Sequence, residues 1–475
     1  MAMRDLATEH SRVGASAERW AEHERSVARL GASYDAIASG QPVRLAKSTT
    51  NLFRVRSVTT APGLDVSGLT GVIEVDAVAR TAEVQGMCTY EDLVDATLPH
   101  GLIPLVVPQL RTITLGGAVT GLGIESTSFR NGLPHESVLE MDVFTGAGEI
   151  VTTRPGEALF DAFANSYGSL GYATRLRISL EPVLPYVSLR HVRFDDAALL
   201  ATTITEIVAT GEHAGERVDG LDGVGFAPGE LYLTLARWTD DPGGPHRQRA
   251  SDYTGRDVFF RSLQERETDL LTIYDYLWRW DTDWFWCSGA FGAQNSLIRR
   301  LWPRRLRRSD VYMRLLALDR RFDIADRLDR RAGRPMRERV VQDIEVPVGR
   351  LAEFLEWFEA EIKMRPVWIC PLVSTGSTGG RGWTTYPLQP GELYVNVGFW
   401  GTVQVGPEAP QAPRNRAIEK KVHALGGHKS LYSEAFYDKE TFDRLYRGDA
   451  LAVVKDRFDP HHRLTSLYDK TVRKK

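Results

Sequence analysis

One glycine-rich stretch, residues 108–126, constrains the fold of this chain more than any other feature. It reads PQLRTITLGGAVTGLGIES and holds four glycines and four small hydroxyl residues in nineteen positions. Glycine admits backbone geometries closed to other residues, and its N–H groups can cradle a diphosphate. Threonine and serine hydroxyls add neutral donors without bulk. The stretch therefore suits a ligand-binding loop, and a tight glycine-rich connection with no ligand fits the same spacing equally well.

The elements around this stretch indicate an α+β protein and argue against a dinucleotide-binding βαβ unit. A Rossmann fingerprint needs GxGxxG directly between a strand and a helix, whereas Gly121 and Gly123 lie deep in a polar stretch, 108–132, that reads as a loop. No GxxxxGK[ST] sequence is present. Residue patterns predict strands at 42–46, 71–76, 81–86 and 339–348, two strands within 138–153, and helices at 16–39, 89–101 and 350–364.

The length of the chain, 475 residues, exceeds what one hydrophobic core usually supports, so two packed domains are expected. Composition is that of a globular protein, at 43% hydrophobic and 25% charged residues. The character of the sequence changes after Val183. We therefore expect a first domain over 1–183, a second over 184–440, and a C-terminal segment over 441–475 that returns to the first.

Cysteines and histidines are too scattered to indicate a disulfide framework or a metal site. Cys88, Cys287 and Cys370 lie far apart without CxxC spacing, which fits a reducing cytoplasm. His461 and His462 fit a polar turn or half of a metal site, but no third ligand is near, and we predict no metal ion. The sequence shows no apolar run of about 18 residues and no signal-peptide core, so we predict a cytoplasmic protein without a membrane-spanning helix.

Positive charge is concentrated in residues 299–339, which hold fifteen arginines against six acidic residues, a local charge of +9 in a chain of net charge −3. Within this region RRLWPRRLRR (299–308) places six arginines around Leu301, Trp302 and Leu306. Such a block is either a solvated surface or an interfacial contact with anionic lipid headgroups. We predict peripheral contact with an anionic membrane through Arg299–Arg308 and no nucleic-acid partner. The oligomeric state is left open.

Three separated motifs occur in an order that resembles a flavoprotein superfamily. KSTTNLF (47–53), the LGG…GLGIESTSF stretch (115–129) and YGSLGYATRL (167–176) resemble the FAD-binding segments of the vanillyl-alcohol oxidase/p-cresol methylhydroxylase superfamily. GGAVTGLGIESTSFRNGL, VVQDIEVPV, RPVWICPL and ELYVNVGFWG further resemble the delta-24 sterol reductases and the actinobacterial 10-methylene fatty-acyl reductases of tuberculostearic acid synthesis. The likeness extends over residues 40–470 and thins across 190–270 and 290–335.

This resemblance implies a two-lobed FAD-binding domain with an inserted α+β cap domain that binds substrate. The diphosphate of FAD would be held by the turn 47–52 and the loop 112–128, with 168–174 along the adenosine half. Members with a covalent flavin carry His or Cys in the first turn, and KSTTNLF has neither, so a non-covalent FAD is expected. The implied FAD-binding residues are Lys47, Ser48, Thr49, Thr50, Asn51, Leu52, Pro108, Thr112, Thr114, Gly116, Gly117, Gly121, Gly123, Ile124, Glu125, Ser126, Ser128, Gly168, Ser169, Gly171, Tyr172 and Thr174.

Two of these residues are open to a second interpretation. Glu125 either bonds the flavin or satisfies N–H groups of its own loop. Tyr172 stands where many relatives have a β-branched residue, which puts its contact with the flavin in doubt.

Candidates for catalysis lie on two strands beyond the first domain. Alternation along 339–348 puts Asp343 and Glu345 on one face, where they form either a proton source of raised pKa or part of a solvated sheet face. Tyr394 alternates in the same way in ELYVNVGFWG. The tryptophan-rich run 276–286 fits core packing or a greasy entrance for an acyl chain.

The function that the resemblance implies is reduction of an unactivated carbon–carbon double bond in a long lipid chain. The Arg- and Ala-rich composition resembles that of actinobacteria, so we predict conversion of 10-methylene to 10-methyl fatty acyl chains, with NADPH as the electron donor. A delta-24 sterol-type reductase is an alternative. So are an alcohol or sugar oxidase on the same scaffold and a non-catalytic lipid- or flavin-binding module.

Overall fold

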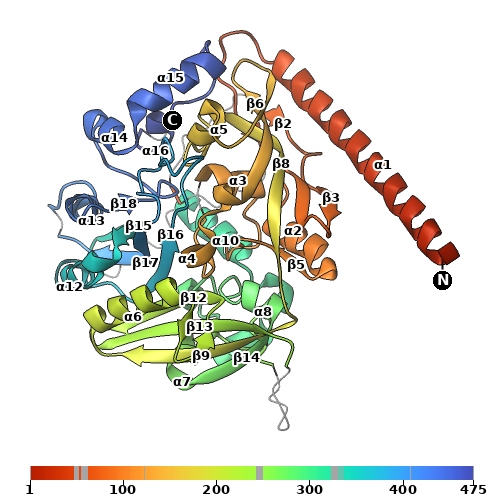
Figure 1. Ribbon diagram of the computed structural model, residues 1–475. Coiled ribbons are helices and arrows are strands. Elements are labelled where there is room, and N and C mark those ends of the chain that lie inside the picture. Colours follow the sequence, from red (N-terminus) through yellow and green to blue (C-terminus); the bar gives the residue numbers. More distant parts are fainter. Residues whose placement is uncertain are drawn as a thin grey trace.

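The structure is a computed structural model that describes residues 2–47, 53–54, 62–121, 123–241, 250–322, 331, 333, 335–406 and 408–473. Two sheets form its body, and helices surround them (Figure 1). The chain passes from the first sheet to the second between Pro182 and Tyr186. This mixture confirms the α+β class, whereas the domain limits at 183 and 440 stay a prediction.

The first sheet has six antiparallel strands in the order β3-β4-β8-β6-β7, with β5 beside β8. Its hairpins are those that the sequence predicted near residues 71–86 and 138–153. A separate parallel pair, β1 and β2, lies near the N-terminus. The bounds are β1 Leu45–Ala46, β2 Leu64–Asp65, β3 Val72–Asp76, β4 Thr81–Gln85, β5 Leu102–Pro104, β6 Val138–Thr145, β7 Ile150–Thr153 and β8 Gly171–Pro182.

The second sheet has eight antiparallel strands in the order β14-β9-β13-β12-β16-β17-β15-β18. A small hairpin, β10 with β11, stands apart from it. The predicted strand at 339–348 is β15. The bounds are β9 Tyr186–Phe194, β10 Glu212–His213, β11 Glu216–Arg217, β12 Gly220–Ala227, β13 Glu230–Thr239, β14 Thr268–Thr272, β15 Arg337–Pro347, β16 Val367–Val373, β17 Leu393–Gln404 and β18 His428–Lys429.

Local sequence signals set the ends of the helices. Thr89 caps α2 by accepting a hydrogen bond from the backbone N–H of Asp92 at 3.1 Å, and Gly101 turns the chain at φ 67° just beyond it. The predicted helix at 16–39 extends further toward the N-terminus, as α1. The bounds are α1 Ala2–Asp35, α2 Tyr90–Thr97, α3 Leu115–Gly121, α4 Ser128–Asn131, α5 Ala158–Phe163, α6 Ala197–Thr210, α7 Phe259–Glu265, α8 Ile273–Leu277, α9 Ser296–Leu301, α10 Ser309–Phe322, α12 Leu351–Glu361, α13 Pro413–Ala424, α14 Lys439–Leu445, α15 Gly448–Phe458 and α16 Leu467–Thr471.

The two faces of the second sheet belong to different cores. Helices α6, α12 and α13 cover one face, where Leu200, Phe354 and Ile418 pack with Ile344 of β15. The other face joins the first sheet in one continuous core, which includes Trp368 of β16. The side of β15 opposite Ile344 therefore turns toward the junction of the two sheets.

The interpretation of 108–132 as a polar loop was wrong in part. The segment contains the short helices α3 and α4, and most of its residues are buried. Leu115 and Val119 of α3 enter the main core. The hydroxyls that make this stretch look exposed are satisfied inside the protein, since Ser126 hydrogen-bonds Tyr276 at 2.7 Å.

The C-terminal part of the chain, α14–α16, lies beside the N-terminal segment (Figure 1). The N–H of Val43 donates to the carbonyl of Arg463 at 2.8 Å, and the Arg463 guanidinium donates to the carbonyl of Ile37 at 3.1 Å. Lys455 and Asp459 pair at 2.6 Å in the same region. Among the described helices, none is long and apolar enough to cross a membrane.

Candidate active site

A cavity of about 800 Å³ opens where the two sheets meet. Its wall takes Gly171 and Ala173 from β8 of the first sheet and Asp343, Trp368 and Trp400 from the second. The volume lies in the range of roughly 300–1,000 Å³ that is typical of cofactor and ligand sites. The wall has two parts of different chemistry, which we call the glycine-rich end and the aromatic end.

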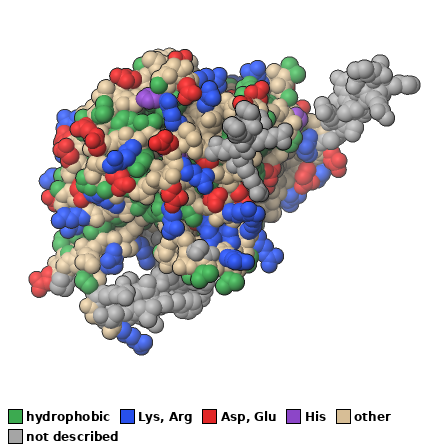
Figure 2. All heavy atoms as spheres, turned by 90° about the horizontal axis from the view of Figure 1, so that it is seen from below, with side chains coloured by type: hydrophobic (Ala, Val, Ile, Leu, Met, Phe, Trp, Pro, Cys, Tyr) green, Lys and Arg blue, Asp and Glu red, His purple; other side chains and the backbone are tan. Residues whose placement is uncertain are grey.

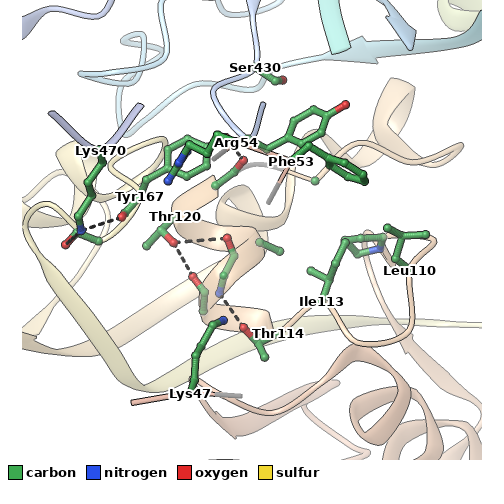
Figure 3. A pocket seen from close by; sticks show the side chains of 18 of the residues that line it. Lys47, Phe53, Arg54, Leu110, Ile113, Thr114, Thr120, Tyr167, Ser430 and Lys470 are labelled. Carbon is green, nitrogen blue, oxygen red and sulfur yellow. Dashed lines mark hydrogen bonds between the residues drawn. The ribbon is translucent and has the colours of Figure 1, made fainter. Parts of the chain in front are cut away.

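The glycine-rich end comprises Lys47, those residues of 114–121 and of 167–173 that line the cavity, and Lys470. Figure 3 shows Lys47 reaching toward the loop that carries Thr114, and Lys470 approaching beside Tyr167. Arg44 adds a further cation to the wall. Several cations beside a helix start and small residues form a suitable environment for a phosphate group.

Several positions in the stretch 116–123 need glycine because other parts of the protein pack directly against them. A Cβ on Gly116 would lie 2.7 Å from the carbonyl oxygen of Gly86, and one on Gly123 would lie 2.7 Å from Cγ of Pro108. Gly117 differs, because it is exposed to the cavity and a Cβ there would meet only the hydroxyl of Thr114, at 2.8 Å. Close approach to a ligand therefore explains Gly117, whereas packing against the protein explains Gly116 and Gly123.

The aromatic end comprises Phe53, Trp284, Phe285, Trp368, Trp400 and Tyr432. Phe285 and Trp400 have ring centroids 4.3 Å apart, and Phe53 stacks on Trp284 at 5.5 Å. Trp284 and Phe285 adopt positive φ angles, 45° and 60°. Such angles are costly for aromatic residues and cluster at functional sites, where surrounding contacts hold them.

Asp343 is the one carboxylic acid among the described residues of the cavity wall. Its Oδ1 accepts a hydrogen bond from Nδ2 of Asn396 at 3.2 Å, and the Tyr432 hydroxyl also donates to it. Tyr432 in turn accepts from Nε1 of Trp400 at 2.8 Å. Burial raises the pKa of Asp343 to about 7 against the lowering effect of these two donors. The carboxyl can therefore carry a proton near neutral pH.

Glu345 lies on the same strand but outside the cavity wall. It is fully buried, accepts from the Ser430 hydroxyl at 2.9 Å, and hydrogen-bonds Nδ1 of His428 at 2.8 Å. The buried Lys429 lies beside it, and burial lowers the pKa of Lys429 to about 8. The solvated sheet face that the sequence also allowed is excluded, but only Asp343 of the acidic pair reaches the cavity.

Several other predicted residues lie away from the wall, and the polar groups of two of them bond to other parts of the protein. Tyr394 donates to Glu392 at 2.9 Å. Glu125 is buried and pairs with Arg279 at 3.1 Å, and it also accepts a hydrogen bond from the backbone N–H of Ser126, which agrees with the interpretation that it satisfies N–H groups of its own loop. The other predicted FAD-binding residues outside the described wall are Thr112, Ser126, Ser128, Ser169 and Thr174.

The remaining FAD-binding predictions fall into two groups. Those that line the cavity are Lys47, Pro108, Thr114, Gly116, Gly117, Gly121, Gly123, Ile124, Gly168, Gly171 and Tyr172. Those that lie outside the described residues are Ser48, Thr49, Thr50, Asn51 and Leu52.

Sequence analysis missed much of the wall. Arg54 lies over the Tyr167 ring and donates to the carbonyl of Leu431 at 2.5 Å. Gln109 lines the cavity with its buried Nε2 lacking a hydrogen-bond partner among the described atoms. Gln109 lies inside the glycine-rich stretch, where a polar side chain was a usable signal. Arg54 and Tyr432 carry no such signal.

The tryptophan run and the arginine block divide between core and surface. Trp278 and Trp280 are core residues, whereas Trp284 and Phe285 line the cavity. Arg299 is buried and pairs with Asp283 at 2.7 Å. Arg307 is also buried, and its guanidinium donates to backbone carbonyls, while Arg308 pairs with Glu91 at 2.6 Å. These three arginines are therefore not available for lipid headgroups.

Comparison with known proteins bears on the chemistry of this site. A family model described as FAD binding domain matches residues 22–154. Delta(24)-sterol reductase of Homo sapiens is 24% identical over 417 residues, 85% of this chain and 76% of that protein. Its namesake in Arabidopsis thaliana is 23% identical over 445 residues, 86% of this chain and 76% of that protein. Cytokinin dehydrogenase 2 of Oryza sativa subsp. japonica is 32% identical over 181 residues, 36% of this chain and 31% of that protein.

The chain is an FAD-dependent oxidoreductase. The matches support the resemblance to the vanillyl-alcohol oxidase superfamily that the motifs indicated. The cavity fits FAD, because cations and exposed backbone at one end suit a diphosphate and aromatic walls at the other suit a flat ring system. Nε2 of Gln109, which has no partner among the described atoms, can donate a further hydrogen bond to the cofactor.

Proposed function

We propose that this oxidoreductase holds FAD non-covalently and reduces a carbon–carbon double bond in a long lipid chain. The observation that carries the proposal is Asp343, which has a pKa of about 7, contacts the aromatic end, and is the one carboxylic acid among the described residues of the wall. An unactivated alkene needs a proton donor and a dry pocket more than it needs polar contacts. Relatives named delta(24)-sterol reductase support a reductase of such a bond.

Reduced FAD, when bound, supplies a hydride. Asp343 would deliver a proton to one alkene carbon, so that positive charge would develop on the more substituted carbon, which is where a hydride supplied by the cofactor would be accepted. Asp343 is left as a carboxylate and regains its proton from solvent. Tyr432 and Asn396 hold the Asp343 carboxyl in place, and Phe285, with its neighbouring aromatic side chains, excludes water.

The non-covalent attachment is supported by the donor set. Neither His nor Cys occurs in residues 47–54 or among the described residues of the cavity wall. We expect purified protein to be yellow and to release intact FAD on acid or heat denaturation. Flavin that stays on the denatured chain would contradict this part of the proposal.

The substrate that we propose is a 10-methylene fatty acyl lipid, reduced to the 10-methyl form with NADPH as donor, and a sterol side chain is the second candidate. In the first test, each substrate is supplied to the enzyme with NADPH carrying deuterium as its transferable hydride. Deuterium at carbon 10 is expected, and label on the methylene carbon would contradict the charge order. Rapid peroxide formation with a polyol would indicate an oxidase instead, and protein that stays colourless after FAD addition would indicate a non-catalytic module.

A second test compares the lipids of a deletion strain with those of its parent. We expect the deletion strain to lose 10-methyl chains and to accumulate their 10-methylene precursors. An unchanged profile would contradict the fatty-acyl substrate and would leave the sterol candidate.

A further inference from the structure

The segment 297–306 exposes an unusual amount of apolar surface. Leu297, Ile298, Leu301 and Leu306 are 72%, 42%, 85% and 40% exposed. They lie on α9 and on the short 3₁₀ turn Arg304–Leu306 that follows it. Isolated exposed apolar residues are common, but four within ten residues mark a contact surface. We call this surface the 297–306 patch.

Arginine is the charged residue of this patch. Arg300, Arg304 and Arg305 are exposed. On the face of the molecule seen from below, Figure 2 shows Lys and Arg side chains lying beside hydrophobic ones. Arg304 approaches Asp252 at 3.6 Å. Within the described part of the chain, no carboxylate lies within ion-pair distance of Arg300 or Arg305. The patch therefore combines exposed leucines with a local positive charge.

Ion pairs connect the segment that carries the patch to residues next to the cavity wall. Arg299 pairs with Asp283, which precedes the wall residue Trp284. Arg308 and Arg111 both pair with Glu91, and Arg111 follows the wall residue Leu110. Arg299 and Arg308 thus connect this part of the chain to two segments of the cavity wall, while the exposed side chains of 297–306 form the patch.

We propose that the 297–306 patch docks on the surface of an anionic phospholipid bilayer. Leu297, Leu301 and Leu306 enter the shallow apolar layer, and Arg300, Arg304 and Arg305 meet the headgroups. The inference deepens the proposed function, on which it rests for its purpose: an acyl chain rarely leaves a bilayer, so the reductase must work where the chain resides. Charge complementarity selects an anionic lipid surface over an uncharged partner.

The test is co-sedimentation of flavin-loaded protein with vesicles of phosphatidylglycerol and phosphatidylcholine, or of phosphatidylcholine alone. We expect the parent protein to bind the anionic vesicles and to dissociate as salt rises. The triple variant Arg300→Gln, Arg304→Gln, Arg305→Gln should bind roughly a hundredfold more weakly, since each basic residue contributes about fivefold near an anionic surface. Leu297→Ser with Leu301→Ser should lose the binding that remains at high salt.

Matched controls replace exposed residues elsewhere. Leu199→Ser with Val453→Ser removes side chains that are 54% and 73% exposed, and this pair should bind like the parent. Flavin content and circular dichroism check that every variant is folded. Turnover of detergent-dispersed substrate should be equal in all of them, which separates docking from catalysis.

Two results would overturn the docking surface whatever the reductase assay shows. One is a parent that ignores anionic vesicles, and the other is a patch variant that binds them as the parent does. Sedimentation velocity tests whether a second copy of the chain, and not a bilayer, covers the patch. If the Leu297/Leu301 variant turns a dimer into a monomer, a second copy of the chain covers the patch.

Discussion

The glycine-rich end of the cavity takes its close packing from one short stretch, 114–121, whereas the aromatic end gathers side chains from five separate segments between Phe53 and Tyr432. At the first end, the backbone is pressed against other backbone, as Gly116 is against Gly86. At the second, side chains are placed by strand register, as Asp343 is by the pairing of β15 with β17. A change at the first end should therefore disturb the fold, and a change at the second should alter the chemistry.

The largest expected effect is a difference in stability between valine variants of the adjacent residues Gly116 and Gly117. Gly116→Val forces a side chain onto the Gly86 carbonyl, so we expect a destabilisation on the order of 3 kcal/mol and complete loss of flavin. Gly117→Val fills cavity space beside a rotatable hydroxyl, so the fold should persist while flavin is lost. Thermal unfolding and flavin absorbance measure the two effects. Equal stability of the two variants would break the comparison.

At the aromatic end, Asp343→Asn removes the carboxylic acid that donates the proton but keeps the size and shape of the side chain. We expect turnover to fall by about 10²–10⁴-fold while FAD occupancy stays at the parent level. Glu345→Gln serves as the control on the same strand, since Glu345 bonds His428 and Ser430 outside the cavity wall. Unchanged turnover in Asp343→Asn would contradict the role of Asp343 as the proton donor and of the aromatic end as the reaction site.

The pH dependence of turnover should report Asp343. Its pKa is raised to about 7, and the protonated form is the active one. Turnover should be constant well below pH 7 and should fall about tenfold for each unit above it, as the carboxyl loses its proton. The inflection should be absent in Asp343→Asn. A rate that rises through pH 7 would contradict an acid role.

The smallest expected effect concerns Tyr432, a positioning residue. Its hydroxyl donates to Asp343 and so lowers the pKa of that carboxyl. Tyr432→Phe should shift the inflection to higher pH and reduce turnover by roughly fivefold, about the value of one hydrogen bond. Trp400→Phe tests the other partner of that hydroxyl. An inflection that stays in place would show that Tyr432 only packs.

These two ends also explain what the sequence could and could not predict. Strands with clean alternation, such as β3, β4 and β15, and helix ends with Thr89 or Gly101 were predicted because their signals are local. Much of the glycine-rich end was predicted because its two main stretches, 114–121 and 167–173, belong to continuous motifs that resemble known FAD-binding segments.

Tertiary packing decided the rest. Glu125 lies in the predicted FAD-binding stretch, yet Arg279, 154 residues away, takes its carboxylate. Arg307 belongs in the sequence to a block of arginines predicted at the surface, but its guanidinium is buried and donates hydrogen bonds to backbone carbonyls. Arg54, Trp368 and Tyr432 come together only through the register of the second sheet and the contacts around it.

The closing contacts between Arg463 and the N-terminal segment bear on how the enzyme acquires its cofactor. Thr465 and Lys470 belong to the cavity wall, as do Pro42 and Val43, so the pocket is complete only after residue 470 has been synthesised and has folded back onto the N-terminal segment. Flavin capture therefore follows that step. A ligand that binds only the native state stabilises that state in proportion to its supply. Cellular flavin should thus set the lifetime of the protein, with empty copies degraded first.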